Sequence, residues 1–305
     1  MTKIMNNIIL LILCFIAGML LHRYKRMPVN APAVLNRFII HVSLPALTLL
    51  YVHDLKFSGN VILMAAMVWI CFAFAAGYIW LVGRWLDLPQ RTAGALILTG
   101  GLGNTSYFGL PMIEAYYGRQ GLATGIIIDQ LGSFLVLSTL GITVAGIYSS
   151  GRPGIGVMFK RVVQFPPFIA LMFALLLIPV DYPDWLAFVL KRLGDTLAPL
   201  ALVAVGFQLR LGHFAGNGRN LAIGLAFKLM LAPLIMFILY VVLLGARGQA
   251  IQITLFEAAM PPMITAAILA TEHDLDPPLA TLMVAVGLII SFVTLTAWWW
   301  LMQGI

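Results

Sequence analysis

Residues 99–118 read TGGLGNTSYFGLPMIEAYYG, and this stretch decides the fold. It contains five glycines, an asparagine, a proline and a glutamate, all of which an ordinary membrane-spanning helix avoids. Proline removes a backbone N–H and clashes with the preceding helical turn, while glycine tolerates an unwound backbone. The stretch therefore predicts an interrupted helix, and the purpose of the interruption depends on the rest of the chain.

The surrounding chain has the composition of a polytopic membrane protein. Of its 305 residues, 62% are hydrophobic and 10% are charged, and the mean hydropathy is +1.00. Charged and helix-breaking clusters divide it into ten apolar runs of about 17–27 residues, the length that a spanning helix needs. Backbone groups in lipid must bond internally, and these runs lack the alternation of a barrel. We therefore expect an all-α protein with ten transmembrane helices.

The distribution of Lys and Arg predicts the orientation in a cell membrane. Loops after odd-numbered helices carry ten of these residues, against four to six on the other side. Positively charged loops stay in the cytoplasm, so both termini are expected outside. The net charge of +7 then reflects topology, and we expect no nucleic-acid partner. The first apolar run is followed by the basic HRYKR (22–26) and not by a cleavage site, so it is interpreted as helix 1.

The two halves of the chain resemble each other weakly at a spacing of about 155 residues. LNRFIIHVSLPALTLL (35–50) matches LKRLGDTLAPLALVAV (190–205), with Pro45 and Pro199 in nearly the same register. A repeat of five helices must enter the membrane a second time from the opposite side, and such inverted pairs are typical of secondary transporters. We expect a first repeat at 1–148, a cytoplasmic connecting loop at 149–161 and a second repeat at 162–305.

Substrate sites in inverted-repeat transporters form where a Gly/Pro-interrupted helix breaks near the midplane in both halves. The matching segments here are GGLGNTSYFGLP (100–111) in helix 4 and FEAAMPPMIT (256–265) in helix 9. Helix N-termini at such breaks attract anions, and released carbonyls suit cations. The alternative is that the glycines permit close helix packing and the prolines only kink. The candidate substrate-binding residues are Gly103, Asn104, Thr105, Ser106, Pro111, Pro261, Pro262 and Thr265.

Three charged residues are expected deep in the membrane. Asp129 and Glu257 each follow the nearest loop arginine by ten residues, or about 15 Å of helix. Intramembrane acids are functional candidates by default, as proton carriers, cation ligands or partners of a base. Lys228 can pair with either acid or attract an anionic substrate, and snorkelling to the surface is its alternative. Glu114 and Asp195 are interpreted as solvated or structural groups.

Several motifs together resemble bacterial members of the auxin efflux carrier family. They are N-T-x-Y-x-G-x-P (104–111), AMPP (259–262), ILATEHDLD (268–276), KLMLAPL (228–234) and the LPAL of helix 2. The resemblance implies helices 4 and 9 crossing at their prolines, and a fold related to bile-acid sodium symporters. It further implies a scaffold of helices 1, 2, 6 and 7, a transport domain of helices 3–5 and 8–10, and a homodimer. One departure from the family pattern is Thr265, where relatives often have an asparagine or another small polar residue after the helix 9 proline.

These observations predict a secondary transporter that moves a small organic anion by alternating access. The family resemblance implies a mono- or dicarboxylate, such as the malonate or malate assigned to bacterial relatives. Coupling to protons, to sodium or to neither stays open. No ATP-binding motif is present, and the scattered histidines and two isolated cysteines favour neither an enzyme nor a metal or other cofactor site. The alternative is a membrane sensor or channel-like protein, which would have the same composition but does not require an inverted repeat.

Overall fold

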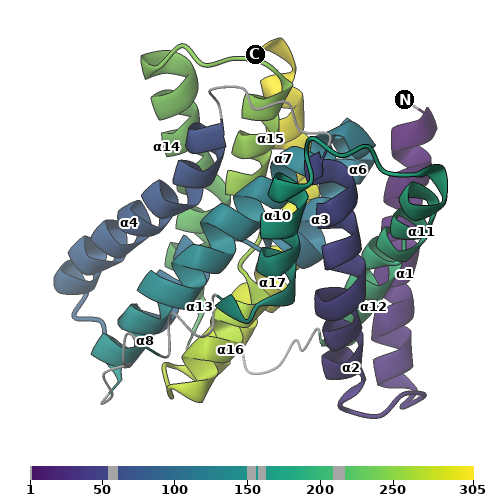
Figure 1. Ribbon diagram of the computed structural model, residues 1–305. Coiled ribbons are helices and arrows are strands. Elements are labelled where there is room, and N and C mark those ends of the chain that lie inside the picture. The colour runs from purple at the N-terminus through teal and green to yellow at the C-terminus, as the bar shows by residue number, and fades with distance from the viewer. Residues whose placement is uncertain (1, 54–60, 150–155, 157–162, 209–216) are drawn as a thin grey trace. The chain divides into compact units, whose positions relative to one another are not determined.

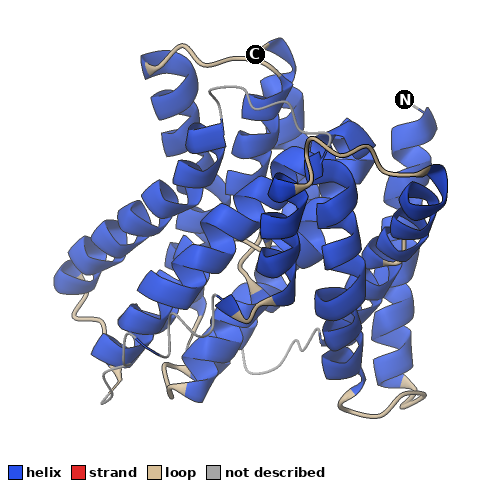
Figure 2. Cartoon of the chain, viewed as in Figure 1, coloured by secondary structure: helices blue, strands red, loops and turns tan. Residues whose placement is uncertain are grey.

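The computed structural model describes residues 2–53, 61–149, 156, 163–208 and 217–305 (Figure 1). Throughout these residues the secondary structure is helical, and Figure 2 shows no strand in them. The single extended pairing is an isolated antiparallel bridge between Gly103 and Pro262. The all-α prediction is therefore confirmed for the described chain. The connecting loop predicted at 149–161 lies almost entirely outside the described residues.

Five helices in the described ranges are long and apolar enough to cross a membrane. They are Ala31–Val52, Val61–Trp85, Arg119–Tyr148, Gly218–Leu243 and Pro277–Gly304. Two further apolar helices, Ile9–Arg23 and Pro166–Leu176, are shorter. Multi-pass insertion follows from these spans, whereas ten spans in two inverted repeats stay a prediction.

The chain divides into two compact units. The first unit comprises Met1–Ser58, Ser106–Gln130 and Val162–Leu209. Its helices are α1 (Thr2–Arg23), α2 (Ala31–Phe38), α3 (Leu44–His53), α6 (Leu110–Tyr117), α7 (Leu122–Ile127), α10 (Pro166–Leu176), α11 (Asp184–Gly194) and α12 (Leu197–Gln208). Within it α1 packs along α12, and α3 packs against α10 and α11.

Two glycines allow α1 and α12 to approach closely. A Cβ atom at Gly18 would collide with the backbone carbonyl of Val203, and one at Gly206 would collide with that of Phe15. Small residues at a helix interface let the backbones come together, because association in lipid relies on van der Waals contact and not on hydrophobic transfer. The pair α1–α12 is thus a tightly packed part of the first unit.

The second unit comprises Gly59–Thr105, Leu131–Arg161 and Arg210–Ile305. Its helices are α4 (Val61–Trp85), α5 (Gln90–Gly101), α8 (Ile142–Tyr148), α13 (Gly218–Ala226), α14 (Ala232–Phe237), α15 (Gln249–Ala258), α16 (Ile264–Glu272) and α17 (Pro277–Leu301). Helix α5 packs against α4, α16 and α17, so it lies at the centre of this unit. Its ten residues from Thr92 to Gly101 are all buried.

Candidate functional site: two paired helix breaks

Both segments that the sequence marks as interrupted are broken in the structure. Helix α5 ends at Gly101, Leu102 is extended (φ −112°, ψ 123°), and a π-helical segment, Thr105–Gly109, then leads into α6. Helix α15 ends at Ala258, and Met263 is extended (φ −70°, ψ 129°) before α16 begins. The predicted interruptions of helices 4 and 9 are therefore present.

The two breaks meet inside the second unit. The Asn104 N–H donates to the Pro261 carbonyl at 2.8 Å, and the Met263 N–H donates to the Leu102 carbonyl at 3.0 Å. Gly103 and Pro262 lie opposite each other between these bonds. Because Pro262 has no N–H to satisfy, it can occupy this central place without losing a donor. Backbone groups released by one break are thus partly satisfied by the other, as burial in lipid requires.

The family resemblance implies that helices 4 and 9 cross at their prolines, whereas the structure sets Pro261 and Pro262 opposite Gly103 and Asn104. Pro111 lies in the first turn of α6, which continues directly from the π-helical segment Thr105–Gly109. Room for Pro262 comes from Gly287 of α17, where a Cβ atom would lie 2.6 Å from the proline ring. The register of the crossing therefore depends on glycines as much as on prolines.

Lys228 lies against both breaks. Its Nζ donates to the Ala258 carbonyl at the C-terminus of α15 over 2.9 Å. A Cβ atom at Gly103 would lie 3.1 Å from the same Nζ, so glycine makes space for the ammonium group. The residue is 2% exposed, which shows that it does not snorkel to the surface. A cation there is favoured by the negative end of the α15 dipole.

Glu257 precedes Ala258 and is also buried, at 1% exposure. Its carboxyl group lies within electrostatic range of Lys228. A buried acid and a buried base from two helices, α15 and the π-helical segment Phe227–Leu231, are thus brought together at the breaks. Of the two acids that the sequence offered as partners for Lys228, Glu257 is the one that the second unit places beside it.

Asn104 is the most distinctive side chain of the break. It is fully buried, and neither its amide oxygen nor its amide nitrogen has a hydrogen-bond partner among the residues that the structure describes. A buried primary amide without partners costs free energy, and native structures usually avoid it. A ligand that both accepts and donates hydrogen bonds would remove this cost.

The neighbouring Thr105 is fixed by a residue that the sequence argument missed. Its hydroxyl donates to Ser133 Oγ at 2.9 Å, and both residues are buried. Ser133 follows Asp129 by one helical turn in the sequence, within the π-helical segment Ile128–Phe134. The sequence signal that could have identified Ser133 is its position one helical turn after the candidate residue Asp129. Segments of π-helix occur frequently at functional sites. Three candidate residues, Thr105, Asp129 and Lys228, each lie in a different π-helical segment.

The other candidates are described within their own units. Ser106, Pro111 and Asp129 belong to the first unit, where Asp129 is 3% exposed and accepts a long hydrogen bond of 3.4 Å from the Gln130 amide. Thr265 is half-buried in the first turn of α16. In the described part of the chain, no three His, Cys, Asp or Glu side chains gather as a metal site.

Glu114 and Asp195, interpreted from the sequence as solvated or structural groups, both bind Arg119 in the first unit. The guanidinium donates to Glu114 at 3.1 Å and to Asp195 at 2.8 Å. All three side chains are partly exposed, so solvent weakens the attraction. This cluster ties the turn between α6 and α7 to the C-terminal end of α11.

Apolar helices of spanning length, together with two paired, buried breaks in the second unit, define a multi-pass membrane protein with polar and charged groups inside that unit. The model of the family described as membrane transport protein matches residues 3–150 and 155–299. The chain therefore belongs to this family, that of the auxin efflux carriers, and the resemblance in its motifs is confirmed.

Two relatives are similar over most of their length. An uncharacterized transporter of Methanothermobacter thermautotrophicus is 30% identical over 272 residues, which cover 87% of each chain. An uncharacterized transporter of Methanocaldococcus jannaschii is 25% identical over 283 residues, covering 88% of this chain and 89% of the relative. The family match and the similarity to two transporters both support the class of membrane transport protein for this chain.

Proposed function

We propose that the protein is a secondary carrier that moves a small organic anion, a mono- or dicarboxylate, across the cell membrane by alternating access. The observation that carries this proposal is Asn104, whose buried amide has no hydrogen-bond partner in the described chain at the point where the breaks meet. A carboxylate would accept from the amide N–H, and a carboxylic acid or hydroxyl group of the same substrate would donate to the amide oxygen.

The charges at the breaks support an anion. Lys228 places its ammonium group beside Gly103, and its bond to Ala258 uses only one of its three N–H donors. The first turn of α16, which includes Thr265, adds partial positive charge, since early N–H groups lack helical partners. We assign Thr105 and Ser106 to the polar lining, and the pairing of Gly103 with Pro262, together with Pro261 and Pro111, to the shape of the backbone.

Two acids provide candidates for coupling. Glu257 lies within electrostatic range of Lys228, and protonation of its carboxyl group would add one positive charge at the breaks. We propose Glu257 and Asp129 as the groups that tune the site or carry a coupling proton, with sodium as the competing ion. Such intramembrane acids are costly to insert, so a role in ion coupling explains their retention.

We also propose two inverted repeats at 1–148 and 162–305, with a scaffold of helices 1, 2, 6 and 7 and a transport part of helices 3–5 and 8–10. The packing of the first unit supports this, because α1 lies along α12 while α3 lies along α10. Here α1 and α3 belong to the expected helices 1 and 2, and α10 and α12 belong to the expected helices 6 and 7. Exchanging the two halves of the chain would therefore convert the pair α1–α12 into the pair α10–α3. The paired breaks of the second unit have the same property, since each comes from one half. Outward-facing termini and a homodimer remain proposals of the same kind.

Uptake into proteoliposomes tests this function. A panel of radiolabelled mono- and dicarboxylates is offered while pH and sodium gradients are varied separately. A carrier gives uptake that saturates with concentration, is inhibited by unlabelled substrate and is accelerated by substrate on the opposite side. Flux that stays proportional to concentration indicates a channel, and binding without flux indicates a sensor. Either of the last two results contradicts the proposal.

A further inference from the structure

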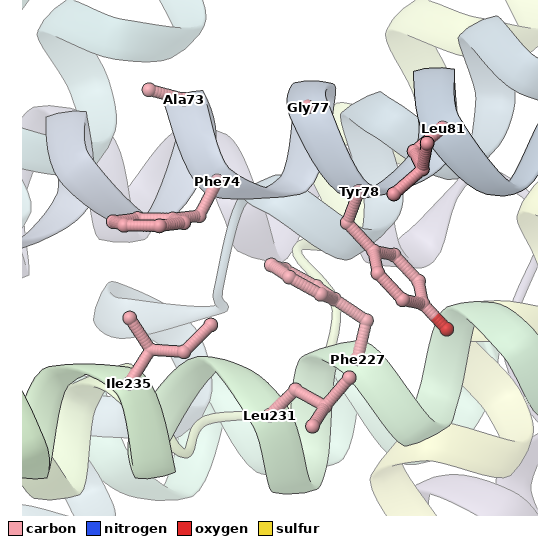
Figure 3. A pocket seen from close by; sticks show the side chains of 8 residues that line it. All are labelled: Ala73, Phe74, Gly77, Tyr78, Leu81, Phe227, Leu231 and Ile235. Atoms are coloured by element: carbon pink, nitrogen blue, oxygen red, sulfur yellow. The ribbon is translucent and has the colours of Figure 1, made fainter.

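A groove lies on the second unit between α4 and the helix formed by α13, the π-helical segment Phe227–Leu231 and α14 (Figure 3). Its volume is about 410 Å³. The lining residues share an apolar character, with one tyrosine among them: Ala73, Phe74, Gly77, Tyr78, Leu81, Phe227, Leu231 and Ile235. It contains none of the residues assigned to the substrate site.

The floor of the groove is built from two stacked rings. Phe227 and Tyr78 have centroids 5.1 Å apart and planes inclined by 26°, and Figure 3 shows both side chains between the two helices. Gly77 opens the wall, because nothing lies within 4 Å of where its Cβ atom would be. The space is therefore a preformed gap between helices and not a region that neighbouring side chains fill.

The walls face outward and are strongly apolar. Phe74 is 48% exposed and Leu81 is 45% exposed, on a helix of 25 residues that is apolar enough to cross the membrane. Such surfaces lie against lipid tails. Bulk lipid is as apolar as the groove, so hydrophobic transfer supplies no driving force for its filling. An occupant would instead gain the dispersion contacts that an empty gap forfeits.

Arg84 places a positive charge near one end of the groove, in the last turn of α4. Phe74, Gly77, Leu81 and Arg84 recur at spacings of three and four, which places them on one face of α4. Arg84 lies in the last turn of α4, and its guanidinium is 5.1 Å from the Trp80 ring centroid. Tryptophan and arginine at a helix end are typical of the membrane interface, where lipid phosphates lie.

We propose that this groove binds one acyl chain of an anionic phospholipid, with the lipid phosphate held by Arg84. The apolar lining accepts the chain, and Arg84 supplies the selectivity for headgroup charge that the lining cannot. Lys and Arg counts assign this end of α4 to the cytoplasmic face, where anionic lipids attract basic residues. The proposal does not depend on which substrate the protein carries.

The groove is lined in part by Phe227, which lies next to the substrate-site residue Lys228 in the chain. A Cβ atom at Gly100 would lie 3.8 Å from the Phe227 ring, and Phe227 immediately precedes Lys228. Gly100 belongs to the last turn of α5, just before the break. An acyl chain packed on Phe227 therefore restrains the segment that carries Lys228.

Photo-crosslinking to the wild-type protein is the first test. The protein is reconstituted with phosphatidylglycerol that carries a diazirine in its acyl chain, irradiated, digested and mapped by mass spectrometry. We expect label on the peptides that contain Phe74 to Leu81 and Leu231 to Ile235, reduced by an excess of unlabelled phosphatidylglycerol more than by phosphatidylcholine. Label spread evenly over all lipid-facing helices would overturn the proposal.

Native mass spectrometry of variants is the second test. Gly77→Leu fills the gap, and Gly83→Leu is its matched control, because a Cβ atom at Gly83 makes only an ordinary contact with Leu88. Gly77→Leu is expected to retain one phospholipid fewer than wild type, and Gly83→Leu the same number. Arg84→Gln is expected to lose the preference for phosphatidylglycerol, whereas Arg23→Gln in the last turn of α1 keeps it.

Thermal unfolding of each variant in detergent confirms that the protein is folded before lipids are counted. The same lipid number in Gly77→Leu as in wild type would overturn the proposal. So would conversion of a dimer into a monomer by Gly77→Leu without loss of lipid, since the groove would then hold a second copy of the chain.

Discussion

Replacing Lys228 by methionine is the perturbation that the structure specifies most fully. Methionine keeps the length of the side chain but removes the ammonium group, and with it the 2.9 Å bond to the Ala258 carbonyl. It also leaves Glu257 buried beside an apolar group instead of a cation. The backbone crossing of Gly103 and Pro262 is kept, since its hydrogen bonds do not involve this side chain.

The expected loss of stability follows from these contacts. A hydrogen bond from a charged donor contributes roughly 1.5–3 kcal/mol, and leaving a buried charge without the opposite charge that faced it costs about 3–5 kcal/mol. The two figures describe overlapping interactions, so we expect a total of about 3–5 kcal/mol. For a protein of several hundred residues this corresponds to a fall of the unfolding midpoint on the order of 10 °C.

The assay is thermal unfolding of purified protein in detergent, followed by tryptophan fluorescence. Lys191→Met is the matched control, because Lys191 is exposed near the end of α11, and its loss should change stability by less than about 0.5 kcal/mol. The double variant Lys228→Met with Glu257→Gln removes both charges. We expect it to recover at least about 1 kcal/mol relative to the sum of the single changes, since paired residues are not additive.

Two results would refute this reasoning. One is a midpoint for Lys228→Met that matches Lys191→Met, which would mean that the ammonium group is solvated in the folded protein. The other is strict additivity in the double variant, which would mean that Lys228 and Glu257 do not interact.

Three further substitutions test other parts of the structure by the same unfolding assay. Gly206→Ala forces a Cβ atom into the Phe15 carbonyl, so we expect a loss of about 1–3 kcal/mol or more, and an unchanged midpoint would contradict the close α1–α12 contact. Thr105→Val removes the bond to Ser133 and should cost roughly 1 kcal/mol, with no change if that bond is absent. Arg119→Gln should cost less than about 1 kcal/mol because its ion pairs are partly exposed, and a larger loss would show that the cluster is shielded from solvent.

The sequence was sufficient for the class of the fold and for the place of the breaks. Apolar runs of spanning length dictate helices, since lipid leaves the backbone no other partner. Clusters of glycine and proline at 100–111 and 256–265 then mark where helices cannot continue, and both segments are broken as expected. Burial of Lys228 beside an acid follows from the cost of a lone charge in lipid.

The register of the crossing could not be predicted in the same way. Glycine and proline together mark both breaks in the sequence, but in helix 4 the chain unwinds at Leu102 to Asn104, and Pro111 lies in the first turn of the next helix. Which residues oppose each other depends on space from Gly103 and Gly287, which is a tertiary property. Ser133 could not be predicted as part of the site for a similar reason, because its contact with Thr105 joins two different helices.

The account depends most directly on Asn104. Its buried amide has no partner in the described chain, so substitution by alanine should leave the unfolding midpoint unchanged or raise it, because a desolvated polar group is removed. Binding should weaken, since loss of a hydrogen bond to a charged ligand costs roughly 1.5–3 kcal/mol, or about tenfold to a hundredfold in Kd.

The decisive measurement is therefore the Kd of the transported carboxylate, by isothermal titration calorimetry, for wild type, Asn104→Ala and Thr294→Val. Thr294 supplies the control, since its hydroxyl is also buried without a hydrogen-bond partner in the described residues. It lies on α17, seven residues past Gly287, or about 10 Å along the helix from the crossing. The account predicts a Kd at least tenfold higher for Asn104→Ala alone, at undiminished stability. An unchanged Kd in a folded Asn104→Ala protein would contradict it.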